Sequence, residues 1–328
     1  MSTSRALPVL RTPGLRVANG AAQRLLAGRT GLGSARTSGI GRGRGGVGPG
    51  MTKILVIGAN GSVGRHVVAS LAEGGHEVRA LVRNAAEAAL PVGVEAVEGD
   101  LAAPESLAAG LSGGVQAVYL MWPGIPVRPR VVELIAEHAE RVVYLSTDVP
   151  DLADDEPPVI FHQEIERLIR RSGLAWTFVR AIDFAGNVLG WAGQVREGLV
   201  RWPYGQARRS LIHERDIADV AVRALIEDGH EGAKYLVTGP ESIAHADLAR
   251  IIGEELGTEV RWAELAPETA REQLTAAWGN AAFVESRLRA WESFTREPER
   301  VTDTVEQVLG RPARTFRSWV RDHAADFR

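Results

Sequence analysis

From residue 52 onward, short and continuously apolar runs alternate with stretches whose apolar residues recur at helical spacing. Continuous apolar runs are typical of parallel strands covered on both faces, and the alternation is typical of successive β-α-β units. Strands are therefore expected at Lys53–Ile57, Glu77–Val82, Val94–Val97, Val115–Met121, Arg141–Ser146 and Ala175–Arg180. Helices are expected between them, at Val63–Glu73, Glu105–Leu111, Arg130–His138 and Phe161–Arg171. Right-handed crossovers then predict an α/β fold with a doubly wound parallel sheet.

The pattern becomes irregular after Arg180, where residues 183–206 are rich in Gly and Trp and are expected to line a cleft. Farther along, the spacing predicts helices at Ile217–Ile226, Ala246–Leu256 and Pro267–Leu309. It also predicts one short strand, at Tyr235–Val237. We therefore divide the chain into an α/β domain over residues 51–182 and a smaller, mostly helical lobe over residues 183–328. The two are expected to be interleaved at about residues 211–238.

Residues 1–50 form an Arg/Gly-rich extension with eight arginines and no acidic residue. Such a composition cannot bury enough apolar surface to offset the entropy of ordering, so we expect this segment to be disordered. Three interpretations remain open: a start codon assigned too far upstream, with Met51 as the true first residue, a transit peptide, or a basic arm that binds an acidic partner.

The rest of the chain is acidic, because it holds the remaining 30 basic residues against all 41 acidic ones. This balance argues against a nucleic-acid partner. The chain has no cysteine, which excludes disulfides and thiolate chemistry and fits a cytoplasmic location. No apolar run approaches 18 residues, so we expect no membrane span.

A glycine-rich loop with the spacing Gly58-x-x-Gly61-x-x-Gly64 joins the first strand to the first helix. This is the pattern of a Rossmann-type dinucleotide site, in which the glycines let the backbone approach a pyrophosphate at the helix N-terminus. A plain strand–helix turn is the less favoured interpretation. The loop residues expected to surround the phosphates are Gly58, Asn60, Gly61, Ser62, Val63 and Gly64.

The end of the second strand favours NADP(H) over NAD(H). Enzymes that prefer NAD commonly have an acidic residue here for the ribose, whereas this chain has Arg83, whose planar donors suit a 2′-phosphate. Arg83 is otherwise a solvated charge at a strand end. Asp100 and Leu101 close the third strand beside the expected adenine position, and the Asp100 carboxylate either accepts a hydrogen bond from adenine or caps the next helix.

These motifs resemble those of the atypical (extended) short-chain dehydrogenases, and in particular their NmrA-like and isoflavone-reductase-like branch. The resemblance covers about Lys53–Gly257 and implies NAD(P) binding on a Rossmann fold. Beyond the glycine loop, Arg83 and Gly99-Asp100, it rests on Glu166, Ser172-Gly173-Leu174, Trp176-Thr-Phe-Val-Arg180, Asn187, His213-Glu-Arg-Asp216-Ile-Ala218 and Tyr235-Leu-Val-Thr-Gly239-Pro240.

The chain departs from the short-chain dehydrogenases because it has no Tyr-x-x-x-Lys pair anywhere. By spacing, Pro158 occupies the tyrosine position and His162 the lysine position. His162 is therefore the candidate proton carrier, since an imidazole titrates near neutrality, or else it contacts the nicotinamide ribose or solvent. Ser146 and Thr147 end the fifth strand, where the resemblance places a hydroxyl near the nicotinamide; capping is the alternative for each.

Other candidate contacts surround this position. Trp122, after the fourth strand, is expected to form a wall of the cofactor pocket. Trp191 and Trp202 either stack on a flat substrate or pack in the core. Arg208 and Arg209 are weak candidates for binding an anionic substrate group, since exposed arginines usually have no such role. The acidic run at residues 151–156 is interpreted as a solvated loop rather than a metal site.

Two functions remain open from the sequence. The favoured one is an NADP(H)-dependent oxidoreductase acting on a small carbonyl, enone or quinone. The alternative is a non-catalytic sensor of NADP(H), as NmrA-like proteins can be, which would report to a protein partner. A nucleotide-sugar epimerase ranks last, because it normally needs the missing tyrosine.

Overall fold

The computed structural model describes residues 52–153 and 156–328. The expectations for residues 1–50 lie outside the described residues, as do Asp154 and Asp155 of the acidic run. Within the described ranges, no helix is both long enough and apolar enough to cross a membrane.

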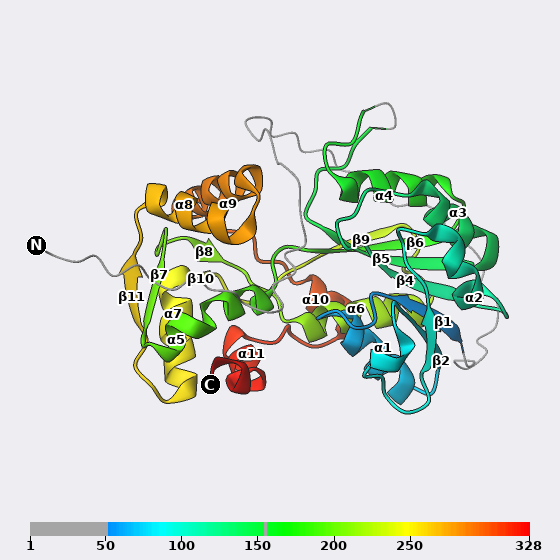
Figure 1. Cartoon of the computed structure of the whole chain (residues 1–328), viewed down its shortest axis with the longest axis horizontal. Helices are drawn as coiled ribbons and strands as arrows, with labels where there is room; N and C mark the ends of the chain where they lie inside the picture. Colours follow the sequence, from blue (N-terminus) through cyan, green and yellow to red (C-terminus); the bar gives the residue numbers. More distant parts are fainter. Residues whose placement is uncertain (1–51, 154–155) are drawn as a thin grey trace, which may run out of the picture.

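Seven parallel strands form the main sheet in the order β3-β2-β1-β4-β5-β6-β9. The strands are β1 (Lys53–Ile57), β2 (Glu77–Val82), β3 (Glu95–Glu98), β4 (Ala117–Met121), β5 (Arg141–Thr147), β6 (Ala175–Ala181) and β9 (Ala233–Val237). The chain runs outward from β1 through β2 to β3 and then returns to β4 on the other side of β1. The strand order therefore reverses between β1 and β4, and ligands of such sheets bind at that switch point. The expected doubly wound α/β sheet is confirmed, and Figure 1 shows its carboxyl edge facing the rest of the chain.

Helices cover both faces of this sheet (Figure 1). One face packs on α1 (Gly64–Glu73), α6 (Glu214–Ile226) and α10 (Thr304–Leu309). The other face packs on α2 (Ala108–Leu111), α3 (Pro129–His138) and α4 (Phe161–Arg171). Each strand therefore contributes alternate side chains to two buried layers, which explains why most of the strands are apolar throughout.

The third strand and the helix after it differ from the prediction. The expected strand Val94–Val97 lies one residue later, and its side chains are mostly exposed because β3 is an edge strand. The expected helix Glu105–Leu111 is a 3₁₀ turn (Pro104–Leu107) followed by α2. Ser106 causes this tighter start, since its hydroxyl bonds the Ala103 carbonyl at 2.6 Å and accepts from the Asp100 amide.

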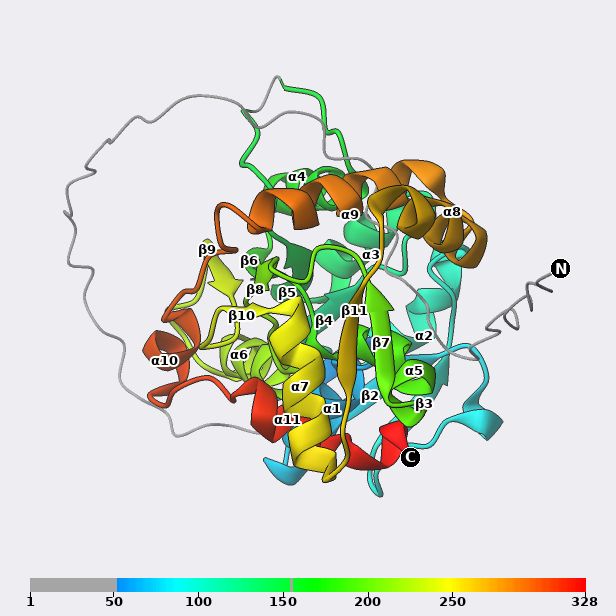
Figure 2. The ribbon, with the colours of Figure 1, turned by 90° about the vertical axis from the view of Figure 1, so that its left-hand side faces the viewer.

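The remaining elements form a smaller lobe at the carboxyl edge of the sheet, seen from its outer side in Figure 2. Its helices are α5 (Ala192–Arg196), α7 (His245–Leu256), α8 (Pro267–Trp278), α9 (Ala281–Phe294) and α11 (Phe316–Asp322). Its strands pair as β7 (Leu199–Trp202) with β11 (Arg261–Glu264) and β8 (Arg208–Arg209) with β10 (Ile243–Ala244). The sequence predicted the helical character but not these short strands or α11.

The helical stretch predicted over residues 267–309 is divided into α8, α9 and α10. Gly279 ends α8 with a φ of +69°, a left-handed conformation that favours glycine. The Asn280 side chain then accepts from the Phe283 amide and starts α9. The chain leaves the lobe after α9, and α10 packs against α6 on the sheet.

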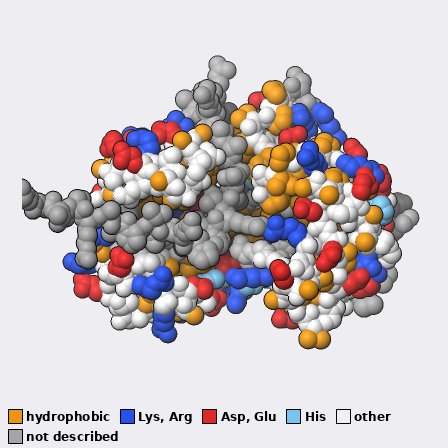
Figure 3. Space-filling model, viewed as in Figure 1, with side chains coloured by type: hydrophobic (Ala, Val, Ile, Leu, Met, Phe, Trp, Pro, Cys, Tyr) orange, Lys and Arg blue, Asp and Glu red, His pale blue; other side chains and the backbone are white. Residues whose placement is uncertain are grey.

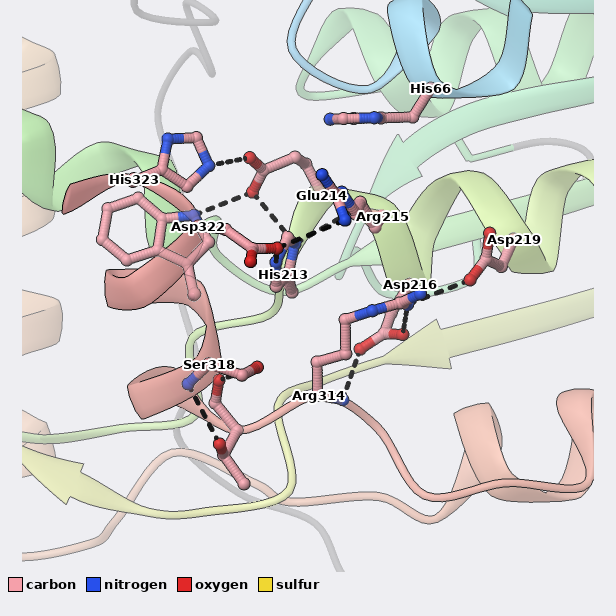
Figure 4. A network of polar contacts seen from close by, with 12 residues as sticks. His66, His213, Glu214, Arg215, Asp216, Asp219, Arg314, Ser318, Asp322 and His323 are labelled. Atoms are coloured by element: carbon pink, nitrogen blue, oxygen red, sulfur yellow. Dashed lines mark hydrogen bonds and ion pairs between the residues drawn. The ribbon is translucent and has the colours of Figure 1, made fainter. Parts of the chain in front are cut away.

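The last helix, α11, is held against the start of α6 by the contacts drawn in Figure 4. Glu214 accepts hydrogen bonds from Trp319 Nε1 at 2.9 Å and from His323 Nε2 at 2.5 Å. Arg65, in the first turn of α1, lies 3.7 Å from the same carboxylate. We call Glu214, Trp319 and His323 the C-terminal clasp. It connects the last helix to the start of α6, and Arg65 links the same Glu214 to α1, the helix that follows the glycine loop.

The clasp contains a histidine with a raised pKa. Burial lowers the pKa of His323, but its hydrogen bonds to Glu214 and Asp326 outweigh that effect and raise it above the ordinary value. The clasp therefore contributes its full stability below the pKa of an unfolded histidine and loses part of it as the pH rises through the folded value. Nearby His66 behaves oppositely, because burial and Arg65 lower its pKa to about 4.

We expect His323→Ala to reduce the free energy of unfolding by roughly 1–2 kcal/mol in mildly acidic buffer and by less in alkaline buffer. Urea denaturation at about pH 6 and about pH 9 measures the difference. His66→Ala serves as the control, since its effect should shift the other way with pH. An equal loss for His323→Ala at both pH values would contradict the assignment.

Candidate functional site

The glycine loop leaves no room for side chains at two of its three glycines. Gly58 has a φ of +92°, and a Cβ there would lie 2.7 Å from the Met121 side chain. A Cβ at Gly64 would lie 2.0 Å from the Gly58 carbonyl oxygen, a distance that no rearrangement of a side chain relieves. The loop therefore closes on itself through direct backbone contact between its first and last glycines, beside the end of β4.

This closure leaves backbone donors unused at the start of α1. Among the described residues, the amides of Ser62, Val63 and Gly64 donate to no acceptor. No side chain caps the helix, and its first turn has no acidic residue. Free amides at the positive end of a helix dipole are a site for an anion, so the donor set fits a pyrophosphate.

The side chains of the loop divide into two groups. Asn60 and Ser62 are exposed and make no hydrogen bond to described residues, so both remain available to a ligand. Val63 is buried and packs in the core between the sheet and α1. The buried side chain of Val63 anchors the loop. Only the backbone of Val63 is available to contact a ligand.

The ends of β2 and β3 place two further predicted residues at the carboxyl edge. Arg83 is exposed and forms no hydrogen bond or ion pair with the described residues. Asp100 is also exposed, and its Oδ1 accepts from the Ala102 amide at 2.8 Å in a local turn. The helix that follows has Ala103 at its N-cap and no side-chain cap, so the capping alternative considered for Asp100 is not observed. Leu101 is buried against the opposite side of the sheet from Val63. Arg83 is thus a cation at this edge that no described residue neutralises.

Trp122 follows β4 and is almost fully buried. Its Nε1 donates to the Ile125 carbonyl at 2.8 Å, so its single donor is used within the loop between β4 and α3. The ring packs in the layer below α3 and α4. Trp122 therefore stiffens the loop next to Met121, and its role as a wall of the cofactor pocket stays a prediction.

Ser146, near the end of β5, belongs to a buried ionic network. Its hydroxyl donates to Glu166 Oε1 at 2.7 Å, and the same carboxylate accepts two hydrogen bonds from Arg180. Arg180 also binds Asp151, which Lys234 contacts at 2.8 Å. These bonds join β5, α4 and β6. The one proton of the Ser146 hydroxyl is engaged by Glu166, so Ser146 has no donor left for a ligand.

Thr147 is only half-buried, and its hydroxyl makes one long hydrogen bond of 3.3 Å to the Ala181 carbonyl. Because successive side chains of a strand point to opposite faces, the Thr147 and Ser146 side chains lie on opposite faces of the sheet. The Thr147 oxygen keeps its lone pairs for another donor. Of the two predicted hydroxyls at this edge, Thr147 is therefore the available one.

His162 lies in the first turn of α4 and is about nine-tenths buried. Its Nδ1 is 2.7 Å from the hydroxyl of Tyr144 on β5, and its ring lies on that of Phe161. Burial lowers the pKa of His162 to about 4, so the ring is neutral at physiological pH. The Nε2 atom of His162 has no hydrogen-bond partner among the described residues. It is also not one of their completely buried polar atoms that lack a partner.

A second ionic cluster closes the lobe side. Asp183, just after β6, accepts hydrogen bonds from Arg209 and from Arg287 of α9. Burial opposes ionisation of Asp183, but the two arginines outweigh it and lower its pKa to about 2. Glu299 binds the other side of Arg209 at 3.1 Å. Arg209 is thus a buried ion-pair residue, and the anion-binding role considered for it is wrong.

The tryptophans of the lobe pack mainly against one another. Trp191 is buried and makes edge contacts with Trp202 and Trp262. Core packing, the second of the two interpretations offered for Trp191, is therefore the one observed. On the face shown in Figure 3, basic side chains in blue and a histidine in pale blue gather where the sheet and the lobe meet.

Sequence reasoning missed Tyr144 and the Asp183 cluster. A signal for Tyr144 was present, since a tyrosine inside an otherwise aliphatic buried strand needs a hydrogen-bond partner. Nothing in the sequence joins Asp183 to Arg287, because about a hundred residues separate them and no motif spans the interval.

Known proteins provide an independent comparison. The chain is 38% identical over 283 residues to a (4-alkanoyl-5-oxo-2,5-dihydrofuran-3-yl)methyl phosphate reductase of Streptomyces griseus, covering 84% of this chain and 99% of that protein. It is 36% identical to an NAD(P)H azoreductase of Xenophilus azovorans, with the same coverage. An NADPH-dependent quinone oxidoreductase of Escherichia coli, solved with NADPH, has the same fold, with a TM-score of 0.68, 23% identity, and coverage of 83% and 99%.

The model of the NmrA-like family matches residues 51–311, which include the whole glycine loop, both ionic networks and His162. The branch to which the sequence motifs pointed is therefore confirmed. This protein belongs to the NmrA-like family.

Proposed function

We propose that the protein is an NADPH-dependent reductase of a small conjugated carbonyl, enone or quinone. The observation that carries the proposal is the row of amides from Ser62 to Gly64 at the switch point of the sheet, together with Arg83 on the neighbouring strand. Neither the amides nor Arg83 has a partner among residues 52–153 and 156–328. The two relatives described above, which match this chain along almost their whole length, are both named as reductases.

The residues present fit the two charged groups of NADPH. The free amides at the start of α1 would hold the pyrophosphate, and Arg83 would bind the 2′-phosphate that distinguishes NADPH from NADH. Asn60 and Ser62 are available for further polar contacts with the dinucleotide. When bound, the nicotinamide supplies a hydride, and the protein orients the acceptor and stabilises the charge that develops.

Chemistry at the acceptor falls to His162 and Thr147 in this proposal. Thr147 ends β5 and His162 lies in the first turn of α4, the helix that follows β5. Each keeps an unused hydrogen-bonding atom among the described residues, Nε2 of His162 and the hydroxyl oxygen of Thr147. The neutral imidazole would bind the oxygen of the acceptor. Since no Tyr-x-x-x-Lys pair exists in this chain, the proton that completes the reduction would come from water.

Two parts of the assignment stay predictions. A cytoplasmic location rests on the lack of cysteine and fits the use of a soluble coenzyme. The sensor alternative would require tight NADPH binding without turnover, so the turnover experiment below separates it from the enzyme.

Arg83→Ala should weaken NADPH binding by about tenfold to a hundredfold and leave NADH binding nearly unchanged, because a charged hydrogen bond to the 2′-phosphate is lost. Fluorescence titration with both coenzymes measures this selectivity. Arg223→Ala, on the exposed side of α6, is the matched control. Equal affinity of wild type and Arg83→Ala for NADPH would remove Arg83 from the site.

Purified protein should consume NADPH in the presence of at least one member of a panel of quinones, enones, aldehydes and azo compounds. His162→Ala should lower kcat by about tenfold to a hundredfold, since one hydrogen bond to the developing charge is lost. Because burial holds the pKa of His162 near 4, the rate between about pH 6 and pH 8 should show no inflection from its ionisation. NADPH binding without turnover on any acceptor would instead support the sensor.

A further inference from the structure

We infer that Tyr144 is a positioning residue that fixes His162 with its proton on Nε2, so that His162 acts as a hydrogen-bond donor and never as a base. The inference rests on the proposed function, because it names the role of His162 in that same site. It also narrows the acceptors to those that present a lone pair, such as a carbonyl or quinone oxygen, to this nitrogen.

The hydrogen-bond geometry leaves one arrangement of protons. Tyr144 is completely buried between β5 and α4, edge-on to Phe178, and its hydroxyl has His162 Nδ1 at 2.7 Å as its only partner among the described residues. A phenol can donate one hydrogen bond, and a neutral imidazole has one nitrogen that accepts and one that donates. If Tyr144 donates to Nδ1, both groups are satisfied and the imidazole proton is on Nε2.

The opposite arrangement leaves a buried donor without a partner. If Nδ1 carried the proton and donated to the phenol oxygen, the Tyr144 proton would have no acceptor in an apolar layer of Val142, Phe178 and Ile165. Leaving such a donor unpaired disfavours that arrangement by roughly tenfold to a hundredfold. The Nε2 proton is therefore set by the neighbour of His162 rather than by the ligand.

Burial favours the neutral form of both groups near physiological pH. Burial raises the pKa of Tyr144 well above its ordinary value, and the nearby Glu166 carboxylate raises it further. Burial also disfavours the imidazolium form of His162. Arg180, which faces the same space, is already paired with Glu166. Transfer of the Tyr144 proton to His162 would create a buried ion pair, so the pair does not work as a proton relay.

The outward face of His162 is consequently an N–H group. During reduction, a hydride adds to the electrophilic carbon, the π electrons of the acceptor move to its oxygen, and the negative charge there is stabilised by the Nε2–H donor. The oxygen then takes a proton from water, which leaves hydroxide in the solvent, and His162 keeps its own proton. A neutral imidazole can serve as such an electrophile because it needs no net charge in a buried site.

The direct test is nuclear magnetic resonance of the full chain labelled with ¹⁵N-histidine, recorded with and without saturating NADPH. Long-range proton–nitrogen correlations distinguish the two neutral tautomers, and His162→Gln assigns the signal. We expect the Nε2–H pattern for His162 in wild type. A wild-type Nδ1–H pattern would overturn the inference, and this readout stands even if a variant does not fold.

Tyr144→Phe tests the positioning role and keeps the packed ring. We expect a mixture of tautomers at His162 and a kcat reduced by about tenfold, with the KM for NADPH within about twofold of wild type. The matched control is Tyr235→Phe, which removes the same 2.7 Å bond between Tyr235 and His230 at the far side of the sheet. That variant should change only the His230 signal.

An unchanged His162 signal and an unchanged kcat in Tyr144→Phe would overturn the inference. Its failure is distinct from that of the proposed function. The tautomer is observed without turnover, whereas a lack of NADPH consumption on every acceptor would remove the reductase and leave the tautomer measurement intact.

Discussion

The structure of the site depends on one backbone contact, the approach of the α1 helix start to the carbonyl of Gly58. Gly64 has no space for even a methyl group beside that oxygen, and Gly58 itself has a left-handed backbone against Met121. This close approach turns the chain from strand to helix so tightly that the amides of Ser62, Val63 and Gly64 find no acceptor in the part of the chain that the structure describes. Unused donors at the switch point of a parallel sheet are what an anionic dinucleotide needs.

The surrounding structure holds this edge rigid through buried polar bonds. Glu166 and Arg180 join β5, α4 and β6, so the strand end with Ser146 and Thr147 is fixed. The hydroxyl of Tyr144 on β5 holds the ring of His162 on α4 by a hydrogen bond to Nδ1. On the lobe side, Asp183 is fixed by two arginines, one of them on α9. Breaking one partner of such buried pairs is costly, so each network fixes one arrangement of its elements. The exposed atoms at the edge are those that the networks leave unused.

The sequence predicted the sheet well because buried parallel strands must be apolar throughout, and β1, β2 and α4 have the bounds expected from that pattern. The glycine loop was predictable because only glycine satisfies its contacts. The pattern failed at β3, an edge strand with little burial to record, and in the lobe, where two-residue strands have no periodicity. The partner of His162 and the Asp183 cluster depend on tertiary contacts that local spacing does not encode.

Calorimetric titration of NADPH into wild type, Gly64→Ala and Gly190→Ala tests the central claim most directly, with circular dichroism to verify folding. Gly190 has open space around its Cβ position, so its variant is the matched control. The account predicts that Gly190→Ala binds as wild type does, whereas folded Gly64→Ala binds at least about a hundredfold more weakly because the loop amides are displaced. A folded Gly64→Ala protein with wild-type affinity for NADPH would contradict it.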